Sequence, residues 1–214
     1  MVPPPAPPTG FKFTFSPSLS PFNIPVAEYL PTRLKNLPAL RHAATGALVF
    51  SRPSGPQGED KILLIQRAPH DSMPLKWEIP GGACDVEDET ILHGLARELW
   101  EESGLMLRNV VRVVSEDIFF TRSGRLVEKV TFEADVEGSG EGTVPNVLLD
   151  PQEHVGFLWA TEEECIAGKV WDDKRGEEVG VEFTTKAQRH VILKGFRLRK
   201  EDREKRKDAK EAEE

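Results

Sequence analysis

The sequence predicts one folded domain of the α/β class, because stretches with the pattern of β-strands alternate along the chain with stretches that have the pattern of helices. The length supports a single domain: of 214 residues, 38% are hydrophobic, which is enough apolar material for one core of ordinary size. The longest apolar runs are too short to cross a bilayer. We therefore expect a domain folded in water.

The N-terminal part of the chain differs from the rest in composition. Ten of the seventeen prolines precede Arg41, so we expect residues 1–40 to form a proline-rich, extended arm that is disordered at its start. The arm contains three closely spaced aromatic residues, Phe11, Phe13 and Phe15. Such an arm fits against a second copy of the chain, so a homodimer is one expectation. Residues 41–200 then form the predicted domain.

Four strands are predicted in the first two thirds of this domain. Residues 43–50 and 61–66 are rich in β-branched and aliphatic side chains, and the segment between them is rich in Gly, Pro and Ser, which indicates two strands and a loop. Residues 110–120 and 126–136 flank a short turn-like segment, and apolar and polar side chains alternate in the second stretch. This pattern predicts a hairpin with one buried face.

A long loop follows the hairpin. Residues 137–152 contain Gly, Pro, Ser and Asn without periodicity, and we expect part of the active site there because long loops in compact domains are often functional. Residues 155–160 resemble a short strand. Thr161 and Glu164 have the spacing of a helix capping box, so a short helix is predicted to end near Gly168.

The last packed helix is predicted over residues 184–200, where Ala187, Val191 and Phe196 recur near helical spacing. Residues 201–214 continue as a strongly charged tail, for which a solvated helical extension and disorder are the two alternatives.

The charge and cysteine content narrow the function classes. A formal net charge of −8 argues against a general nucleic-acid binder, and an acidic body that handles anionic substrates needs a bound cation. The proline-rich start lacks the apolar middle of a signal peptide, and the two cysteines are too few for a disulfide framework. We therefore expect a cytoplasmic protein without a membrane partner; a nuclear location is not excluded.

The segment that carries chemistry is an amphipathic helix predicted over residues 89–104 and stopped by Gly104. Glu98 lies one helical turn from both Glu101 and Glu102, so three carboxylates cluster on the polar side. In water two charges ~5 Å apart repel by only about 1 kcal/mol, which a solvated surface tolerates. In a partly enclosed site the repulsion rises to roughly 3 kcal/mol, and a hard cation such as Mg²⁺ becomes the natural compensation.

The residues around this helix strengthen the signal. Gly81 and Gly82 precede it, and Arg97-Glu98-Leu99-Trp100-Glu101-Glu102-Ser103-Gly104-Leu105 closes it. Residues 81–105 resemble the Nudix box, whose pattern is Gly, five residues, Glu, seven residues, then Arg-Glu-apolar-any-Glu-Glu-any-Gly-apolar. With Glu89 as the first glutamate, the match has one departure: six residues, not five, separate it from Gly82.

The resemblance implies a Nudix-type α/β/α sandwich with a mixed central sheet, the box helix on one face and the C-terminal helix on the other. It implies Mg²⁺-dependent hydrolysis, with Mn²⁺ as an alternative cofactor, of a diphosphate linkage in a nucleoside diphosphate derivative. Carried over to this chain, Glu98 and Glu102 are metal ligands, Glu101 is a further ligand or base, and Arg97 orients the carboxylates. A backbone carbonyl also reaches the metal, that of Gly82 or of a neighbouring residue, Gly81 or Ala83.

Outside the box, Glu153 is the leading candidate for one more carboxylate, as ligand or base. The alternatives ranked below it are Glu128, Glu133 and Asp135. Arg67 is a candidate substrate contact, because relatives place a basic residue at such a position. No catalytic role is assigned to His93 or His154, because a lone histidine at a strand or helix position is more often structural.

Two rival functions and the substrate stay open. A Nudix-fold module that binds or senses a nucleotide without cleaving it is the first rival, and an interaction protein built around the charged tail is the second. Signatures of particular subgroups are missing: Phe120 and Thr121 stand where a proline would indicate ADP-ribose, and the only tyrosine, Tyr29, lies upstream of the box. The sequence therefore leaves the nucleoside diphosphate derivative undetermined.

Overall fold

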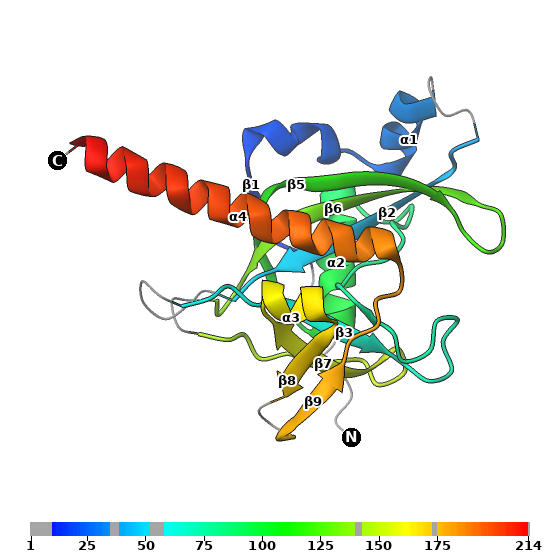
Figure 1. Ribbon diagram of the computed structural model, residues 1–214. Coiled ribbons are helices and arrows are strands. Elements are labelled where there is room, and N and C mark those ends of the chain that lie inside the picture. Colours follow the sequence, from blue (N-terminus) through cyan, green and yellow to red (C-terminus); the bar gives the residue numbers. More distant parts are fainter. Residues whose placement is uncertain (1–9, 35–38, 52–57, 140–142, 173–174, 214) are drawn as a thin grey trace.

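Two β-sheets form the centre of the fold, and helices cover them on both sides (Figure 1). The computed structural model describes residues 10–34, 39–51, 58–139, 143–172 and 175–213. A four-stranded sheet has the order β1-β5-β6-β2, a three-stranded sheet has the order β4-β3-β7, and β8 pairs with β9. The strands are β1 (Thr14–Phe15), β2 (His42–Val49), β3 (Ile62–Arg67), β4 (Trp77–Glu78), β5 (Leu107–Phe120), β6 (Leu126–Val136), β7 (His154–Ala160), β8 (Lys169–Asp172) and β9 (Glu177–Gly180).

The larger sheet is mixed, as the family resemblance implied. β2 runs parallel to β6, β1 runs parallel to β5, and β5 pairs antiparallel with β6 as the predicted hairpin. In the smaller sheet β3 lies between β4 and β7, and both pairings are antiparallel. The α/β class and the sandwich of layers are thus confirmed.

The helical segments are η1 (Pro17–Phe22, a 3₁₀ helix), α1 (Val26–Leu34), α2 (Ile91–Ser103), α3 (Glu162–Ala167) and α4 (Lys186–Glu213). The ends of α2 follow its sequence. Thr90 is the N-cap and its side chain accepts a hydrogen bond from the amide of His93, while Gly104 ends the helix in the left-handed conformation with φ 67°. The capping box predicted for Thr161 and Glu164 at α3 is also confirmed.

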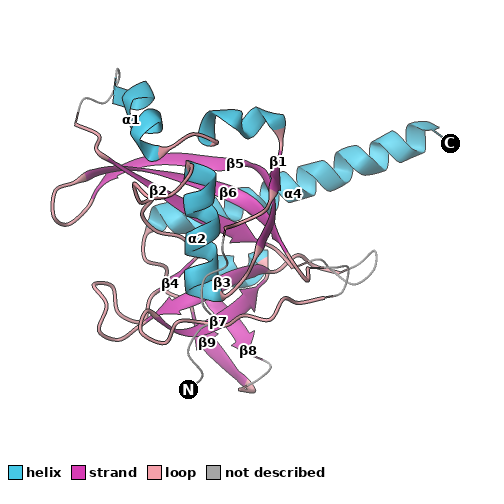
Figure 2. Cartoon of the chain, turned by 180° about the vertical axis from the view of Figure 1, so that it is seen from behind, coloured by secondary structure: helices cyan, strands magenta, loops and turns pink. Residues whose placement is uncertain are grey.

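Two apolar clusters separate the layers. The apolar stripe of α2, with Leu92, Leu95 and Leu99, packs in the first cluster against the inner side chains of both sheets. Phe196 of α4 packs in the second cluster, on the opposite side of the sheets. Figure 2 shows α2 and α4 on opposite sides of the strands. The box helix therefore rests on a rigid base, with its carboxylates at the edge of the first cluster.

The N-terminal segment is more folded than the extended arm expected for residues 1–40. From residue 10 it forms β1, η1 and α1, and Leu19, Phe22 and Tyr29 are buried in the first cluster. Three further aromatic side chains pack, partly buried, against the core of their own chain: Phe11, Phe13 and Phe15. Residues 1–9, where disorder was expected, lie outside the described residues.

The C-terminal helix is longer than the sequence pattern predicted. α4 begins at Lys186 and continues through the charged tail to Glu213, so the helical extension is the alternative that the structure shows. Figure 1 shows its last turns reaching beyond the sheets. Among the described residues, none of the helices has the length and apolar character needed to cross a membrane.

Candidate active site

The three glutamates at the end of α2 differ in how much solvent reaches them. The side chain of Glu102 is 9% exposed, that of Glu98 is 13% exposed and that of Glu101 is 45% exposed. This gradient follows the helix surface from the sandwich toward water. The cluster therefore combines two enclosed carboxylates with one at the rim, and the solvated-face interpretation does not apply to Glu98 or Glu102.

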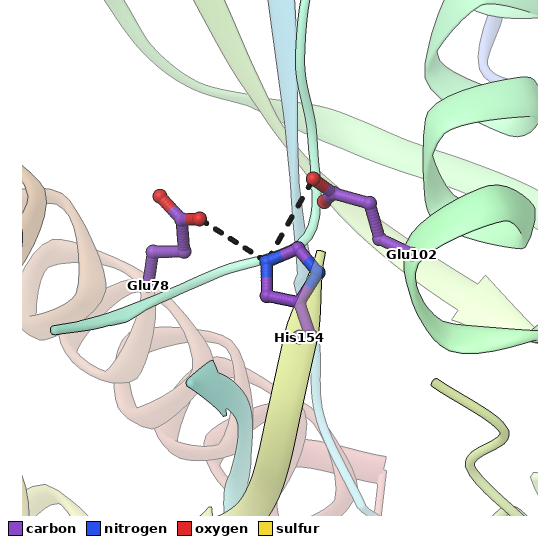
Figure 3. Close-up of side chains that lie close together, drawn as sticks. All are labelled: Glu78, Glu102 and His154. Atoms are coloured by element: carbon purple, nitrogen blue, oxygen red, sulfur yellow. Dashed lines mark hydrogen bonds and ion pairs between the residues drawn. The ribbon is translucent and has the colours of Figure 1, made fainter. Parts of the chain in front are cut away.

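Glu102 faces two residues from the smaller sheet, as Figure 3 shows. Nε2 of His154, at the start of β7, lies 3.2 Å from Oε1 of Glu78 and 3.9 Å from Oε1 of Glu102. One ligand atom from each of these three residues lies within 4.8 Å of the others. The backbone amide of Gly81 donates a 2.6 Å hydrogen bond to Oε2 of Glu102, which fixes the carboxylate against the loop before the helix.

Glu98 lies beside this group and contacts the same loop. A Cβ placed on Gly82 would lie 2.8 Å from Cδ of Glu98, so a side chain at this position would displace the Glu98 carboxylate. Arg97 donates hydrogen bonds of 2.8 Å to both Glu98 and Glu101. Arg97 thus contacts both carboxylates through charge-assisted hydrogen bonds.

The electrostatics of the site favour a bound cation. Burial, followed by the negative charges of Glu78 and Glu98, raises the pKa of Glu102 well above that of an ordinary glutamate. Burial also raises the pKa of Glu98, although Arg97 opposes the shift, and Glu101 and Glu153 add to it. The clustered carboxylates repel one another in an enclosed space, and a divalent cation would remove that repulsion.

The donor atoms fit a hard divalent cation. Carboxylate oxygens are the ligands that Mg²⁺ and Mn²⁺ prefer, and Glu102 belongs both to the group with Glu78 and to the pair with Glu98. Nδ1 of His154 is buried and has no hydrogen-bond partner among the described residues. Of the carbonyls considered from sequence, that of Gly82 accepts a hydrogen bond from the amide of Thr45, and that of Ala83 accepts one from Arg97.

The structure explains the departure from the box pattern in the loop before the helix. Asp88, which is 9% exposed, accepts hydrogen bonds from Arg97 at 2.9 and 3.0 Å and packs against Gly94 of α2. The side chain of Glu89 is 77% exposed and pairs with His93. Five residues separate Gly82 from Asp88, which is the family spacing. The acidic residue that contacts the box arginine is therefore Asp88, and the extra residue lies after it.

The other residues predicted from the sequence differ in whether they lie beside this cluster or pair with groups elsewhere. Glu153 is exposed, directly precedes His154, and is close enough to raise the pKa of Glu98. Arg67 donates hydrogen bonds to Asp71 and Glu78, so its guanidinium is held by two carboxylates beside the site. The lower-ranked alternatives pair with arginines outside the cluster: Glu128 with Arg33, Glu133 with Arg112 and Arg199, and Asp135 with Arg108.

Sequence reasoning did not assign Glu78 or His154 to the site. Glu78 stands shortly before the glycines of the box, and His154 directly follows Glu153. No repeating pattern in the sequence relates either residue to the box helix. Their proximity arises because β4 and β7 flank β3 in the smaller sheet. The signals in the sequence were the position of Glu78 shortly before the glycines and the histidine at 154, which was considered and given no catalytic role.

Comparisons with known proteins agree with the fold. A family model described as NUDIX domain matches residues 40–183. A MutT-like protein of Streptomyces ambofaciens is 30% identical over 102 residues, which is 44% of this chain and 60% of the relative. An RNA pyrophosphohydrolase of Psychrobacter sp. (strain PRwf-1) is 41% identical over 59 residues, which is 28% of this chain and 31% of the relative. The chain thus spans less than two thirds of the length of either relative.

Two solved structures share the fold. The MutT protein from Methanosarcina mazei Go1 superposes with a TM-score of 0.52 at 23% identity, covering 77% of this chain and 99% of that one. The NUDIX domain of Shewanella oneidensis NrtR, crystallised with ADP ribose, superposes with a TM-score of 0.53 at 17% identity, covering 82% of this chain and 99% of that one. At these identities the likeness establishes the fold alone.

Proposed function

Because the chain belongs to the Nudix family, we propose that it is a pyrophosphohydrolase that cleaves the diphosphate linkage of a nucleoside diphosphate derivative with a divalent cation, Mg²⁺ or Mn²⁺. The observation that carries the proposal is the enclosed carboxylate pair of Glu98 and Glu102: burial raises the pKa of both, and the negative charges of Glu78 and Glu98 add to the shift of Glu102. A bound divalent cation would offset the electrostatic repulsion among these carboxylates.

In this proposal Glu102 and Glu98 would hold the cation, with Glu78, His154 and a carbonyl of the Gly81–Gly82 turn as further candidate ligands. When bound, the cation withdraws negative charge from the phosphate oxygens and makes the attacking water more acidic. Arg97 keeps Glu98 and Glu101 oriented through its hydrogen bonds to both. The enclosed position of Glu102 excludes bulk water, which strengthens each electrostatic contact.

The proton released by the attacking water needs a carboxylate that exchanges with solvent. Glu101 and Glu153 are exposed residues beside Glu98, and both influence its pKa. We propose them as the two candidates for the general base, with Glu101 as an alternative metal ligand. The substrate contact predicted for Arg67 stays a prediction, because its guanidinium already donates to Asp71 and Glu78.

The names of the relatives guide the choice of substrates. One relative is called an RNA pyrophosphohydrolase, and the NUDIX domain of NrtR was crystallised with ADP ribose. ADP-ribose and RNA with a 5′-triphosphate both contain an anhydride bond between the 5′-phosphate of a nucleoside and a second phosphate group. A panel should therefore hold ADP-ribose, nucleoside triphosphates, dinucleoside polyphosphates and a 5′-triphosphorylated RNA.

The test measures the products from this panel with Mg²⁺, with Mn²⁺ and with EDTA. Native protein and Glu102→Gln are compared, and Glu163→Gln serves as the control, because Glu163 is an exposed glutamate on α3. Cation-dependent cleavage that Glu102→Gln loses and Glu163→Gln keeps supports the proposal and identifies the substrate class. Cleavage that Glu102→Gln retains in full contradicts the role given to this residue.

The same experiment separates the enzyme from the rival sensing module. If the native protein binds a nucleotide of the panel, as measured by calorimetry, and cleaves none with either cation, the hydrolase proposal is overturned and the sensing module takes its place.

A further inference from the structure

Lys129 on β6 lies on the sheet side of the active site. β6 pairs with β2 so that Lys129 is opposite Ala44 and Thr131 is opposite Gly46. A Cβ placed on Gly46 would lie 2.9 Å from Cε of Lys129 and 3.1 Å from Cδ1 of Ile79. The lysine stem therefore crosses β2 over a residue without a side chain. Ile79 directly follows Glu78, so this path brings the lysine to the segment that carries the site.

Lys129 lies close to the loop that holds the buried carboxylate of the site. A Cβ placed on Gly81 would lie 2.6 Å from Cα of Gly46, the residue that the Lys129 stem crosses, and the amide of Gly81 donates a hydrogen bond to Glu102. Lys129 is half-buried, and among the residues that the structure describes it takes part in no ion pair. Asp117 stands opposite it on β5, but the Asp117 carboxylate accepts a 2.7 Å hydrogen bond from Ser115. Within the described part of the chain, the ammonium group thus has no bonded carboxylate.

The arginines near the same sheets are arranged differently. Arg67 and Arg97 each donate to two or more carboxylates, and Arg33 pairs with both Glu116 and Glu128. Each of these guanidinium groups already has its anions. Lys129 is a cation at the site that remains available for an anion brought by a ligand.

We propose that Lys129 binds a phosphate group of the substrate, on the side of the diphosphate that faces the large sheet. The inference rests on the proposed function and adds a substrate-binding residue to it. A diphosphate carries negative charge on two phosphorus centres, and the carboxylates of α2 repel it wherever no cation intervenes. An ammonium group on a flexible stem supplies a compact charge with three donors, which suits a phosphate oxygen.

The test compares binding of inorganic pyrophosphate, in the presence of Mg²⁺, by native protein and by Lys129→Met, Lys129→Arg and Lys169→Met. Lys169 is the matched control, because its side chain is 60% exposed and pairs with Glu178 on the separate β8–β9 hairpin. Isothermal titration calorimetry should show an affinity reduced about tenfold or more for Lys129→Met, as expected for loss of one charge-assisted contact. Lys129→Arg should keep most of the affinity, and Lys169→Met should match the native protein.

A second titration, with Mg²⁺ alone, separates substrate binding from a role in neutralising Glu102. If Lys129 contacts the phosphate, Lys129→Met binds Mg²⁺ at least as well as the native protein, because a repelling cation has been removed. Weaker Mg²⁺ binding by Lys129→Met, with a circular dichroism spectrum and melting temperature like those of the native protein, overturns the inference.

The outcomes distinguish this inference from the proposed function. Equal pyrophosphate affinity of native protein and Lys129→Met overturns the inference and leaves the hydrolase proposal intact. No pyrophosphate binding by native protein also overturns it. Pyrophosphate binding that depends on Lys129, in a protein that cleaves no member of the substrate panel, upholds the lysine as a phosphate ligand while the hydrolase proposal fails. If Lys129→Met unfolds, Lys129→Gln provides the same comparison, because it removes the positive charge and keeps a polar side chain of similar size.

Discussion

Buried carboxylates occur in two regions of this molecule, and the regions compensate them differently. In the first region, which we call the α4 network, the side chains of Asp60 and Glu133 are only 2% and 3% exposed. Arg199 of α4 pairs with both of them, Arg203 pairs with Asp60, and Arg112 pairs with Glu133. Each buried negative charge therefore has guanidinium partners from the chain itself.

The second region is the active site, where the carboxylate of Glu102 is nearly as enclosed but has no guanidinium partner among the described residues. Its contacts are the amide of Gly81 and, at 3.9 Å, the ring of His154, and its pKa is raised. The difference shows that burial of acids alone does not identify a functional site. A buried acid with its own arginines stabilises the fold, whereas a group of buried acids short of positive charge is suited to an incoming cation.

Breaking the α4 network should give the largest effect on stability. Arg199→Met leaves Asp60 and Glu133 with one arginine each, and we expect the free energy of unfolding to fall by about 3 kcal/mol. Urea unfolding measures the loss. Arg197→Met is the control: Arg197 is 64% exposed, so the change should stay within about 0.5 kcal/mol. If Arg199→Met is as stable as the native protein, the network does not stabilise the fold.

Mg²⁺ should act on the second region alone. A cation that binds only the folded protein, at about 100 times its Kd, adds about 2.7 kcal/mol of stability, or roughly 5 to 10 °C in Tm for a chain of this size. We expect this increase in the native protein and in Arg199→Met, and little increase in Glu102→Gln. Differential scanning calorimetry with Mg²⁺ and with EDTA measures it. An equal increase in Glu102→Gln would place the cation elsewhere.

The active site also contains an arginine that pairs with a buried carboxylate, as in the α4 network. This arginine is Arg97, and the carboxylate is that of Asp88. Asp88→Asn removes the charge of the most buried carboxylate that pairs with Arg97, so we expect kcat/KM to fall about tenfold, equivalent to about 1.4 kcal/mol of transition-state stabilisation. Glu89→Gln, one residue further on, should stay within about twofold, because Glu89 is exposed and pairs with His93. If steady-state kinetics show a larger loss of kcat/KM for Glu89→Gln than for Asp88→Asn, Glu89 and not Asp88 is the residue that serves at this position of the box.

The smallest effect expected is an opposite pH dependence of the two regions. In the metal-free protein the pKa of Glu102 is raised by burial, so between the unfolded and folded pKa values the folded state holds more protons and stability falls as pH rises. The pKa of Asp202, beside the α4 network, is lowered by its hydrogen bond with Arg112, so its contribution is present above the unfolded pKa and is lost as pH falls through the folded one.

Melting temperatures measured in EDTA across this pH range test both signs. Glu102→Gln should flatten the fall in Tm toward neutral pH, and Asp202→Asn should flatten the loss in acid. If native protein and Glu102→Gln have parallel profiles from about pH 4.3 upward, where an ordinary glutamate has lost its proton, the raised pKa of Glu102 is contradicted.

The local parts of the fold were predictable because their causes are local. The cap at Thr161, the end of α2 at Gly104 and the clustering of Glu98 with Glu101 and Glu102 follow from positions within a few residues of one another. The hairpin of β5 and β6 follows from alternation along single strands. The family resemblance supplied the order of the layers, which the mixed sheet between α2 and α4 confirms.

The N-terminal segment shows where composition misled the prediction. Prolines in residues 17–31 suggested an extended arm, yet Pro17 begins η1 and the short helices bury Leu19, Phe22 and Tyr29. Proline is compatible with the first turn of a helix, so its abundance alone did not exclude these elements. Whether an apolar side chain of such a segment finds a core depends on the surface that the rest of the chain presents.

The sequence by itself determined that this chain has a Nudix box and which three glutamates of α2 stand on one side of the helix. Only the tertiary structure decided that Glu102 and Glu98 are enclosed, that Asp88 contacts Arg97, that Glu78 and His154 lie beside Glu102, and that the stem of Lys129 crosses Gly46. The physical reason is distance along the chain. Helical spacing fixes neighbours within one turn, whereas strand order and packing bring together residues from β4, β6 and β7 that no local pattern relates.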